Sequence, residues 1–267
     1  NGKLYKFKLR PGLKYSNGAA IRASDFEFAI KRGFLAQGQG VGFYTDIAGA
    51  AAYAAHPTAS GDISGITANN AKRTITIRMA KPRGDFLTIL ALIFAAPVPA
   101  GTSPALHNGN IPASGPYRIV GYTPNRGFTM LRNRFFKPTK DIPRGNPNRV
   151  EVSLIGDANT ATQRVIGGQA DYSNGAIPPD RIASVRSRGH LLLRKTANTY
   201  YFWMNVNVAP FNKLKVRQAV NYAIDRKALQ TLVWGGLGQP TQNILPPTYP
   251  SYRKLKLYNH NVAKARQ

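Results

Sequence analysis

The four histidines are the residues here with the broadest chemical repertoire, and they stand far apart, at His56, His107, His190 and His260. A metal site needs neutral imidazoles or carboxylates that converge on one point, and no carboxylate stands at ligand spacing from any of them. The 267 residues include no cysteine, which excludes disulfides, thiolate metal sites and cysteine nucleophiles. We therefore expect structural or surface histidines, with no metal and no cofactor.

Carboxylates are too few and too scattered to predict acid–base catalysis. The chain has only 11 Asp and Glu residues. Asp25 and Glu27 are two positions apart, so they would point to different sides of a helix, where we expect them to stabilise its N-terminus. Asp225 is expected to pair with a nearby arginine such as Arg226. The nucleophile-elbow, Walker A and HExxH motifs are absent, and the sequence predicts a protein that is not an enzyme.

The charge is strongly positive, with 37 Lys and Arg residues, a formal net charge of +26 and a pI of about 10.7. Such a charge attracts polyanions, but the basic residues are scattered, with no run longer than pairs such as Lys31-Arg32. We expect a solvated cationic surface and no specific nucleic-acid binding. A content of 43% hydrophobic and 10% aromatic residues is typical of a globular chain. The longest mainly apolar run, residues 86–100, is too short and too interrupted to span a membrane.

Strand-like and helix-like patterns follow one another along the chain, which predicts an α/β or mixed α+β fold. We expect strands at residues 4–9, 73–79, 115–122, 128–132, 150–155, 170–172, 191–195 and 200–206, and helices at 86–93, 158–167 and 177–188. A further helix should begin at Ser24 as N-cap, with Glu27 completing a capping box, and run to about Gly33. The strongest helical pattern predicts one continuous helix over 216–233, with Ala219, Ala223 and Ile224 buried.

Six short motifs, in order along the chain, resemble one protein family. They are YKFKLRPGLKYSNG at 5–18, ASDF with KR at 23–32, SGPY with LRNRFF at 114–136, GQAD at 168–171, PFNKLKVRQAV with AIDR at 210–226, and the Gly/Pro-rich segment at 235–247. Together they resemble the family 5 solute-binding proteins of bacterial ABC importers, which bind peptides, oligopeptides or nickel. The sequence departs from the family at Asn148 and Lys213, where aspartate is usual, and this contributes to its charge.

The resemblance implies a two-lobed, periplasmic-binding-protein-like architecture of type II character that closes around its ligand by a hinge. Residues 1–110 and 111–196 would form two subdomains of the first lobe, and 197–267 the crossover and the beginning of the second. Family members are about twice this long. The chain opens inside a predicted strand and closes inside a predicted helix, so we expect it to be a piece of a longer polypeptide.

Ligand contacts are expected mainly from residues 198–203, which match the family strand that crosses into the second lobe beside the cleft. Strand alternation would place Thr199, Tyr201 and Trp203 on one face, with Asn198 at the start of the segment. The alternative is a core strand that is packed on both faces. Tyr44 matches a region where the family places an aromatic residue against the ligand, and Asn174 is a weaker match.

The resemblance also implies partners and a location. The expected ligand is a peptide or similar small solute, delivered to the membrane permease of an ABC importer by a monomeric binding protein. The protein would be periplasmic or extracellular, associated with the membrane through a lipid anchor or the permease. The alternative from a different class is a cationic surface protein that binds anionic envelope polymers or nucleic acid.

Overall fold

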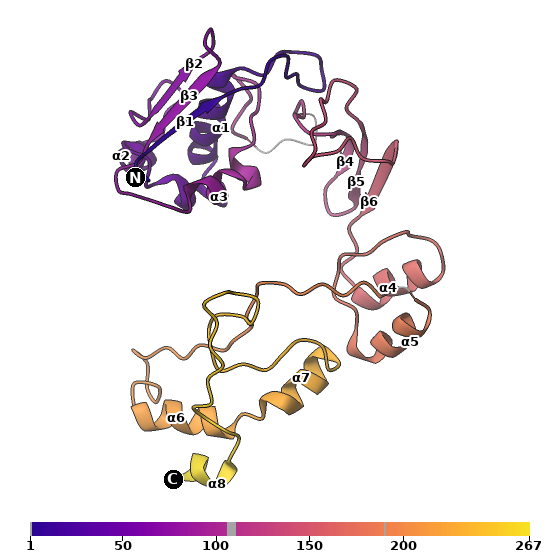
Figure 1. Cartoon of the computed structure of the whole chain (residues 1–267). Coiled ribbons are helices and arrows are strands. Elements are labelled where there is room, and N and C mark those ends of the chain that lie inside the picture. The colour runs from indigo at the N-terminus through magenta and orange to yellow at the C-terminus, as the bar shows by residue number, and fades with distance from the viewer. Residues whose placement is uncertain (1, 106–110, 190) are drawn as a thin grey trace. The chain divides into compact units, whose positions relative to one another are not determined.

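The computed structural model describes residues 2–105, 111–189 and 191–267, which form two compact units, one up to Leu154 and one from Ile155 (Figure 1). Both helices and strands are present, as the sequence predicts. The boundary between the two units falls at 154/155. The predicted lobe and subdomain boundaries, at 110/111 and 196/197, remain predictions.

The first unit is organised around a three-stranded antiparallel sheet. Its strands are β1 (Leu4–Lys8), β2 (Ile66–Asn69) and β3 (Thr74–Arg78), in the order β1-β3-β2. Ile75 lies opposite Phe7 of β1, and Ile77 opposite Ile66 of β2. Ile75 and Ile77 are buried whereas Thr74, Thr76 and Arg78 between and beside them are not, because successive side chains of a strand point to opposite faces.

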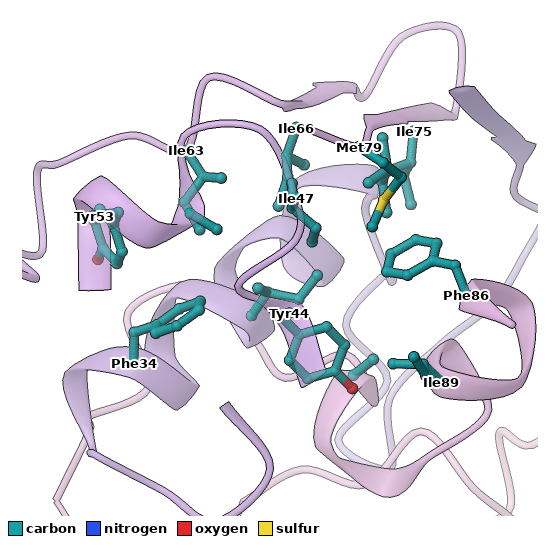
Figure 2. Close-up of a cluster of buried hydrophobic side chains, with 14 of the residues drawn as sticks. Phe34, Tyr44, Ile47, Tyr53, Ile63, Ile66, Ile75, Met79, Phe86 and Ile89 are labelled. Atoms are coloured by element: carbon teal, nitrogen blue, oxygen red, sulfur yellow. The ribbon is translucent and has the colours of Figure 1, made fainter. Parts of the chain in front are cut away.

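One face of this sheet packs against helix α1 (Ala23–Leu35) and a set of short helices. They are α2 (Ala50–Ala55), α3 (Phe86–Leu90) and the 3₁₀ helices η1 (Val41–Tyr44) and η2 (Ile93–Ala95). Figure 2 shows the shared core, in which Phe34 of α1 meets Tyr53 edge-to-face and Phe86 lies near Met79. Each such buried side chain contributes about 1.5–3 kcal/mol, which makes this core the main source of stability in the unit.

Helix α1 begins with a different cap from the predicted one. Arg22 is the N-cap residue, and the carboxylate of Asp25, three residues later, accepts a hydrogen bond from the Arg22 backbone N–H at 2.8 Å. The Ser24 hydroxyl instead accepts from the Asn70 side chain. The predicted capping box of Ser24 and Glu27 is therefore wrong in its register, because the helix begins two residues earlier, with Arg22 as N-cap and Asp25 as its partner.

A second antiparallel sheet completes the first unit. Its strands are β4 (Tyr117–Thr123), β5 (Gly127–Arg132) and β6 (Arg149–Ser153), in the order β4-β5-β6. The predicted hairpin between β4 and β5 is confirmed. A glycine is required at 127, because a Cβ there would lie 2.0 Å from the Val152 carbonyl oxygen of β6.

Asn133, directly after β5, holds this sheet to the rest of the first unit. Its buried side chain donates to the carbonyls of Gly115, at 2.9 Å, and Ala113, and accepts from the Phe135 N–H. Ser16 in turn donates its N–H to the Ala113 carbonyl and accepts from the Ala113 N–H through its hydroxyl. Asn133 therefore fixes the segment 113–115, and Ser16 joins the same segment to the chain that follows β1.

The second unit is helical where it is regular. Its elements are α4 (Ala158–Ile166), η3 (Pro179–Arg181), α5 (Ile182–Ser187), α6 (Leu214–Ala223), α7 (Arg226–Trp234) and α8 (Val262–Arg266). Helix α6 packs against α8 (Figure 1). Among the described residues of this unit, the buried hydrophobic side chains are Ile182 and Val185, so it has a much smaller core than the first unit.

The predicted continuous helix over 216–233 is wrong. It is broken between α6 and α7, where Ile224 and Asp225 adopt extended backbone angles. The Asp225 carboxylate accepts from the backbone N–H groups of Lys227 and Ala228, at 2.9 and 3.0 Å, and so caps a new helix. Aspartate is a strong N-cap and a poor interior residue, which accounts for the break. Ala219 and Ile224 are only partly buried and Ala223 is exposed.

The strands predicted at 170–172, 191–195 and 200–206 are also wrong, since no β-ladder forms in the described part of the second unit. A strand exists only where a neighbour pairs with its backbone groups, and these segments have none there. The helix predicted at 86–93 is split into α3 and η2, and that at 177–188 into η3 and α5.

Candidate functional site

Residues 198–203 form an extended, solvent-exposed segment. Tyr200 and Tyr201 are exposed, as are Phe202 and Trp203, which keep 83% and 77% of their surface accessible. The Tyr200 ring contacts the Trp234 ring of α7 in a tilted arrangement, with ring centroids 4.6 Å apart. The two-sided core strand considered above is therefore excluded in this structure, because aromatic rings at successive positions face solvent.

The main chain of residues 198–203 is unpaired within the part of the chain that the structure describes. From Asn198 to Trp203, no hydrogen bond is formed with any residue that the structure describes. The Thr199 hydroxyl is buried and likewise has no partner there. N–H and C=O groups that have no partner in the described ranges, beside aromatic rings, can pair with the backbone of an extended peptide while the rings contact its side chains.

Tyr44 is placed differently from the other candidates. Its ring is packed in the core of the first unit, 2% exposed, beside Ile47 and Ile89 (Figure 2). Its hydroxyl is buried without a partner among the described residues, and this burial raises its pKa above the usual tyrosine value. In this conformation a ligand cannot reach it.

Its neighbour Phe43 is exposed and stacks on Phe94 of η2, with centroids 6.4 Å apart. Sequence reasoning missed this aromatic pair. Gly40 adopts a left-handed backbone conformation, and the 3₁₀ turn of η1 follows it. This turn places the Tyr44 ring in the core and the Phe43 ring at the surface. Helix or strand periodicity in the sequence does not predict this orientation.

Asn174 and Asn198 are exposed and lie outside regular secondary structure. No hydrogen bond or ring contact within the described ranges joins any two of the six predicted site residues. All six stay predictions as ligand contacts.

The histidines and carboxylates show no assembled metal or catalytic centre in the part of the chain that the structure describes. No three His, Asp or Glu side chains gather there as metal ligands would. His107 and His190 lie outside the described residues. Glu27 has Asp62 as a neighbour, and its pKa is raised by burial and then by Asp62.

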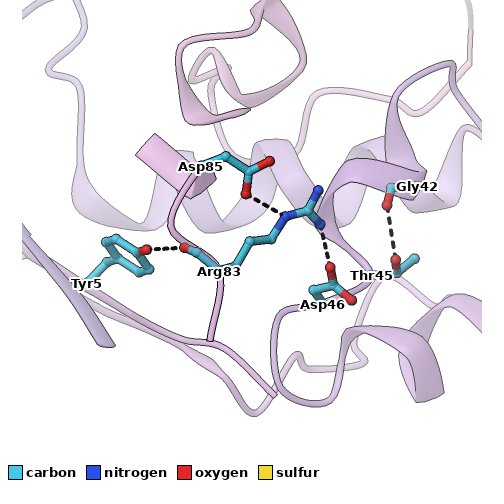
Figure 3. A network of polar contacts seen from close by, with 6 residues as sticks. All are labelled: Tyr5, Gly42, Thr45, Asp46, Arg83 and Asp85. Atoms are coloured by element: carbon cyan, nitrogen blue, oxygen red, sulfur yellow. Dashed lines mark hydrogen bonds and ion pairs between the residues drawn. The ribbon is translucent and has the colours of Figure 1, made fainter. Parts of the chain in front are cut away.

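Several carboxylates have structural partners instead. The Arg83 guanidinium bridges Asp46 and Asp85, with its Nε 3.0 Å from the Asp85 carboxylate, and Tyr5 donates to the Arg83 carbonyl (Figure 3). Asp225 does not pair with Arg226 as predicted. It caps α7 and lies 3.5 Å from Nδ1 of His260, while Arg226 donates to Asn221 and Tyr258.

None of the helices over the described ranges has the length and apolar character needed to cross a bilayer.

The chain resembles known proteins over its whole length. A family model described as "Bacterial extracellular solute-binding proteins, family 5 Middle" matches residues 1–267. The "Oligopeptide-binding protein OppA" of Bacillus subtilis (strain 168) is 22% identical over 267 residues, which is 96% of this chain and 48% of that protein. The "Glutathione-binding protein GsiB" of Escherichia coli O6:K15:H31 (strain 536 / UPEC) is 28% identical over 284 residues, covering 100% of this chain and 49% of that one.

Solved structures agree with this fold. The protein named "Clavulanic acid biosynthesis oligopeptide binding protein 2" matches with a TM-score of 0.83 and 26% identity, over 99% of this chain and 51% of that chain. The chain spans about half the length of the curated relatives it matches. The predicted fold class is confirmed. Since the family model matches every residue, the chain belongs to the bacterial extracellular solute-binding proteins of family 5.

Proposed function

We propose that this chain is part of the substrate-binding component of a bacterial ABC importer, which captures peptides or a similar small solute and delivers them to a membrane permease. Family membership supports this, and so do the names of the relatives, since OppA is named for oligopeptides and GsiB for glutathione, itself a peptide. The same comparisons favour this function over the alternative of a cationic protein that binds envelope polymers.

The observation that carries the proposal is the segment 198–203. A peptide bound in an extended conformation brings one N–H and one C=O per residue, which this segment can pair as an added strand. Tyr201 and Trp203 offer large apolar areas to the ligand's side chains. Such recognition depends on the backbone more than on side-chain identity, so it tolerates varied peptide sequences.

In this proposal the ligand lies between two lobes and favours their closed arrangement because it contacts both. The protein acts as a monomer and releases its ligand chemically unchanged. It works in the periplasm or outside the cell, held at the membrane by a lipid anchor or by the permease.

The test is calorimetric titration of the whole protein with short peptides and glutathione. Tyr201→Ala and Trp203→Ala should each weaken binding of a peptide ligand by roughly 1–3 kcal/mol, as expected of aromatic anchors. Tyr172→Ala is a matched control, because Tyr172 is an exposed tyrosine of the same unit outside the segment. Equal affinities of all three variants and the parent protein would contradict the role of residues 198–203.

A further inference from the structure

An open groove of about 290 Å³ lies within the second unit, apart from residues 198–203. One wall is the junction of α6 and α7, residues 224–227, and the other is the chain from Tyr252 to His260. Residues 240–242, with the Thr241 hydroxyl, complete the lining. Its volume is near the lower end of the range for small-molecule sites, about 300–1,000 Å³.

Side-chain clamps hold the two walls together. Arg226 donates to the carbonyl and side-chain oxygens of Asn221 on α6, and weakly to the Tyr258 carbonyl on the opposite wall. The Gln242 amide accepts from the N–H groups of Leu257 and Tyr258, both at 2.7 Å, and donates to the Tyr258 carbonyl. The groove is therefore preorganised, which lowers the entropy cost of binding a ligand there.

The lining is strongly cationic. Lys227 comes from one wall and Lys254 and Lys256 from the other, and all three are exposed. Within the described residues none of these lysines has a carboxylate within ion-pair distance, although the charge of Lys227 also acts on Asp225 and helps to lower its pKa. The one acidic side chain in the lining, Asp225, is already engaged by two backbone N–H groups of α7 and by His260 at 3.5 Å.

We propose that this groove is a binding site for a phosphate-bearing small anion. Lysines that line the groove on both walls can neutralise a doubly charged phosphate group, and lysine is a common ligand of phosphate. The hydroxyls of Thr241 and Tyr252, 3.3 Å apart in the lining, can hydrogen-bond phosphate oxygens. The capped N-terminus of α7 is not needed for this site, because Asp225 already occupies its N–H groups.

The test is a calorimetric titration of the full chain with inorganic phosphate and with pyrophosphate. The double variant Lys254→Gln/Lys256→Gln should weaken pyrophosphate binding by about tenfold or more, because it removes two charge-assisted contacts. The matched control is Lys213→Gln/Lys215→Gln, which removes the same charge from exposed positions outside the groove and should leave the affinity within about twofold. The replaced lysines are exposed, so both variants are expected to fold, and thermal melts check this.

The bound phosphate group belongs either to a lipid headgroup or to a free anion, and binding to lipid vesicles distinguishes these two sources. Loss of capture by phosphatidylglycerol vesicles in the groove variant alone would identify a lipid headgroup as the ligand. Equal capture of both variants, with pyrophosphate affinity still dependent on the groove lysines, would identify a free anion. The proposal is overturned if pyrophosphate binding is not saturable or if both double variants weaken it equally. That result would leave the peptide-binding proposal untouched, because the groove shares no residue with 198–203.

Discussion

The buried pair of Tyr15 and Asp25 provides a sharp test of what holds the first unit together. Asp25 is 3% exposed, and one of its oxygens, Oδ2, accepts from the Tyr15 hydroxyl at 2.9 Å and from the Arg22 N–H at 2.8 Å. Tyr15 is also buried, so its hydroxyl has no access to water as a substitute partner. Removal of Asp25 therefore leaves the buried Tyr15 hydroxyl unsatisfied, whereas removal of the Tyr15 hydroxyl leaves Asp25 with the Arg22 N–H as its partner.

The structure sets the expected magnitudes. Tyr15→Phe removes one hydrogen bond to a charged acceptor and should lower the free energy of unfolding by about 1.5–3 kcal/mol. Asp25→Ala removes both bonds and strands the Tyr15 hydroxyl, so it should cost about 3–5 kcal/mol. The double variant should cost no more than Asp25→Ala alone, because the stranded hydroxyl is then absent.

The pH dependence has a defined sign. Burial, and then the bond to Asp25, raise the pKa of Tyr15 in the folded state above its usual value of about 10. A group whose pKa is raised on folding stabilises the fold below its unfolded pKa, and this contribution is lost as the pH rises further. The parent protein should therefore lose stability above about pH 10, and Tyr15→Phe should lose less.

The assay is urea unfolding followed by circular dichroism, with amide hydrogen exchange in α1 as a local readout. Tryptophan fluorescence is unsuitable because Trp203 and Trp234 both lie in the second unit. Tyr122→Phe is the control, an exposed tyrosine of the same unit. The reasoning is refuted if Tyr15→Phe behaves like this control.

Three further changes test other features. Asn133→Ala should lower the free energy of unfolding by about 2–4 kcal/mol, because it removes the side-chain partner of the Gly115 carbonyl and of the Phe135 N–H, and urea unfolding measures this. Asp225→Ala should shorten α7, seen as faster amide exchange at Lys227 and Ala228. Because these N–H bonds lower the pKa of Asp225, the parent should lose the same protection only as the pH falls below about 4. Phe202→Ala should change the free energy of unfolding by less than about 0.5 kcal/mol, since the ring is exposed, and a loss of several kcal/mol in thermal melts would show that it packs in a core.

Local signals were sufficient to predict several strands of the first unit and the body of α1. Alternating residues on either side of a turn predict the β4–β5 hairpin, because partners so close in sequence need no distant information. The helical spacing of Ile30 and Phe34 likewise predicts the buried face of α1. The family motif around Asn133 has a physical basis in its three side-chain hydrogen bonds.

The second unit was less predictable for two physical reasons. The helical spacing of apolar residues continues from one end of 216–233 to the other and so predicts a single helix. The break at Ile224 and Asp225 comes instead from the Asp225 side chain, which caps α7. Alternation along 200–206 describes side chains only, whereas a strand requires a neighbouring backbone. The lysine groove could not be predicted either, since its two walls are distant in sequence and are joined by the hydrogen bonds of Arg226 and Gln242 to Tyr258.

The junction of Ser16 with Ala113 has a consequence for the order of folding. These residues are 97 positions apart, and closing a loop of that length costs about 4 kcal/mol of chain entropy by the logarithmic rule. The β4–β5 hairpin closes across only a few residues, and strand β6 follows soon after it. We expect this sheet to form early and to dock late, so φ-values should be high in β4 and β5 and near zero at Ser16.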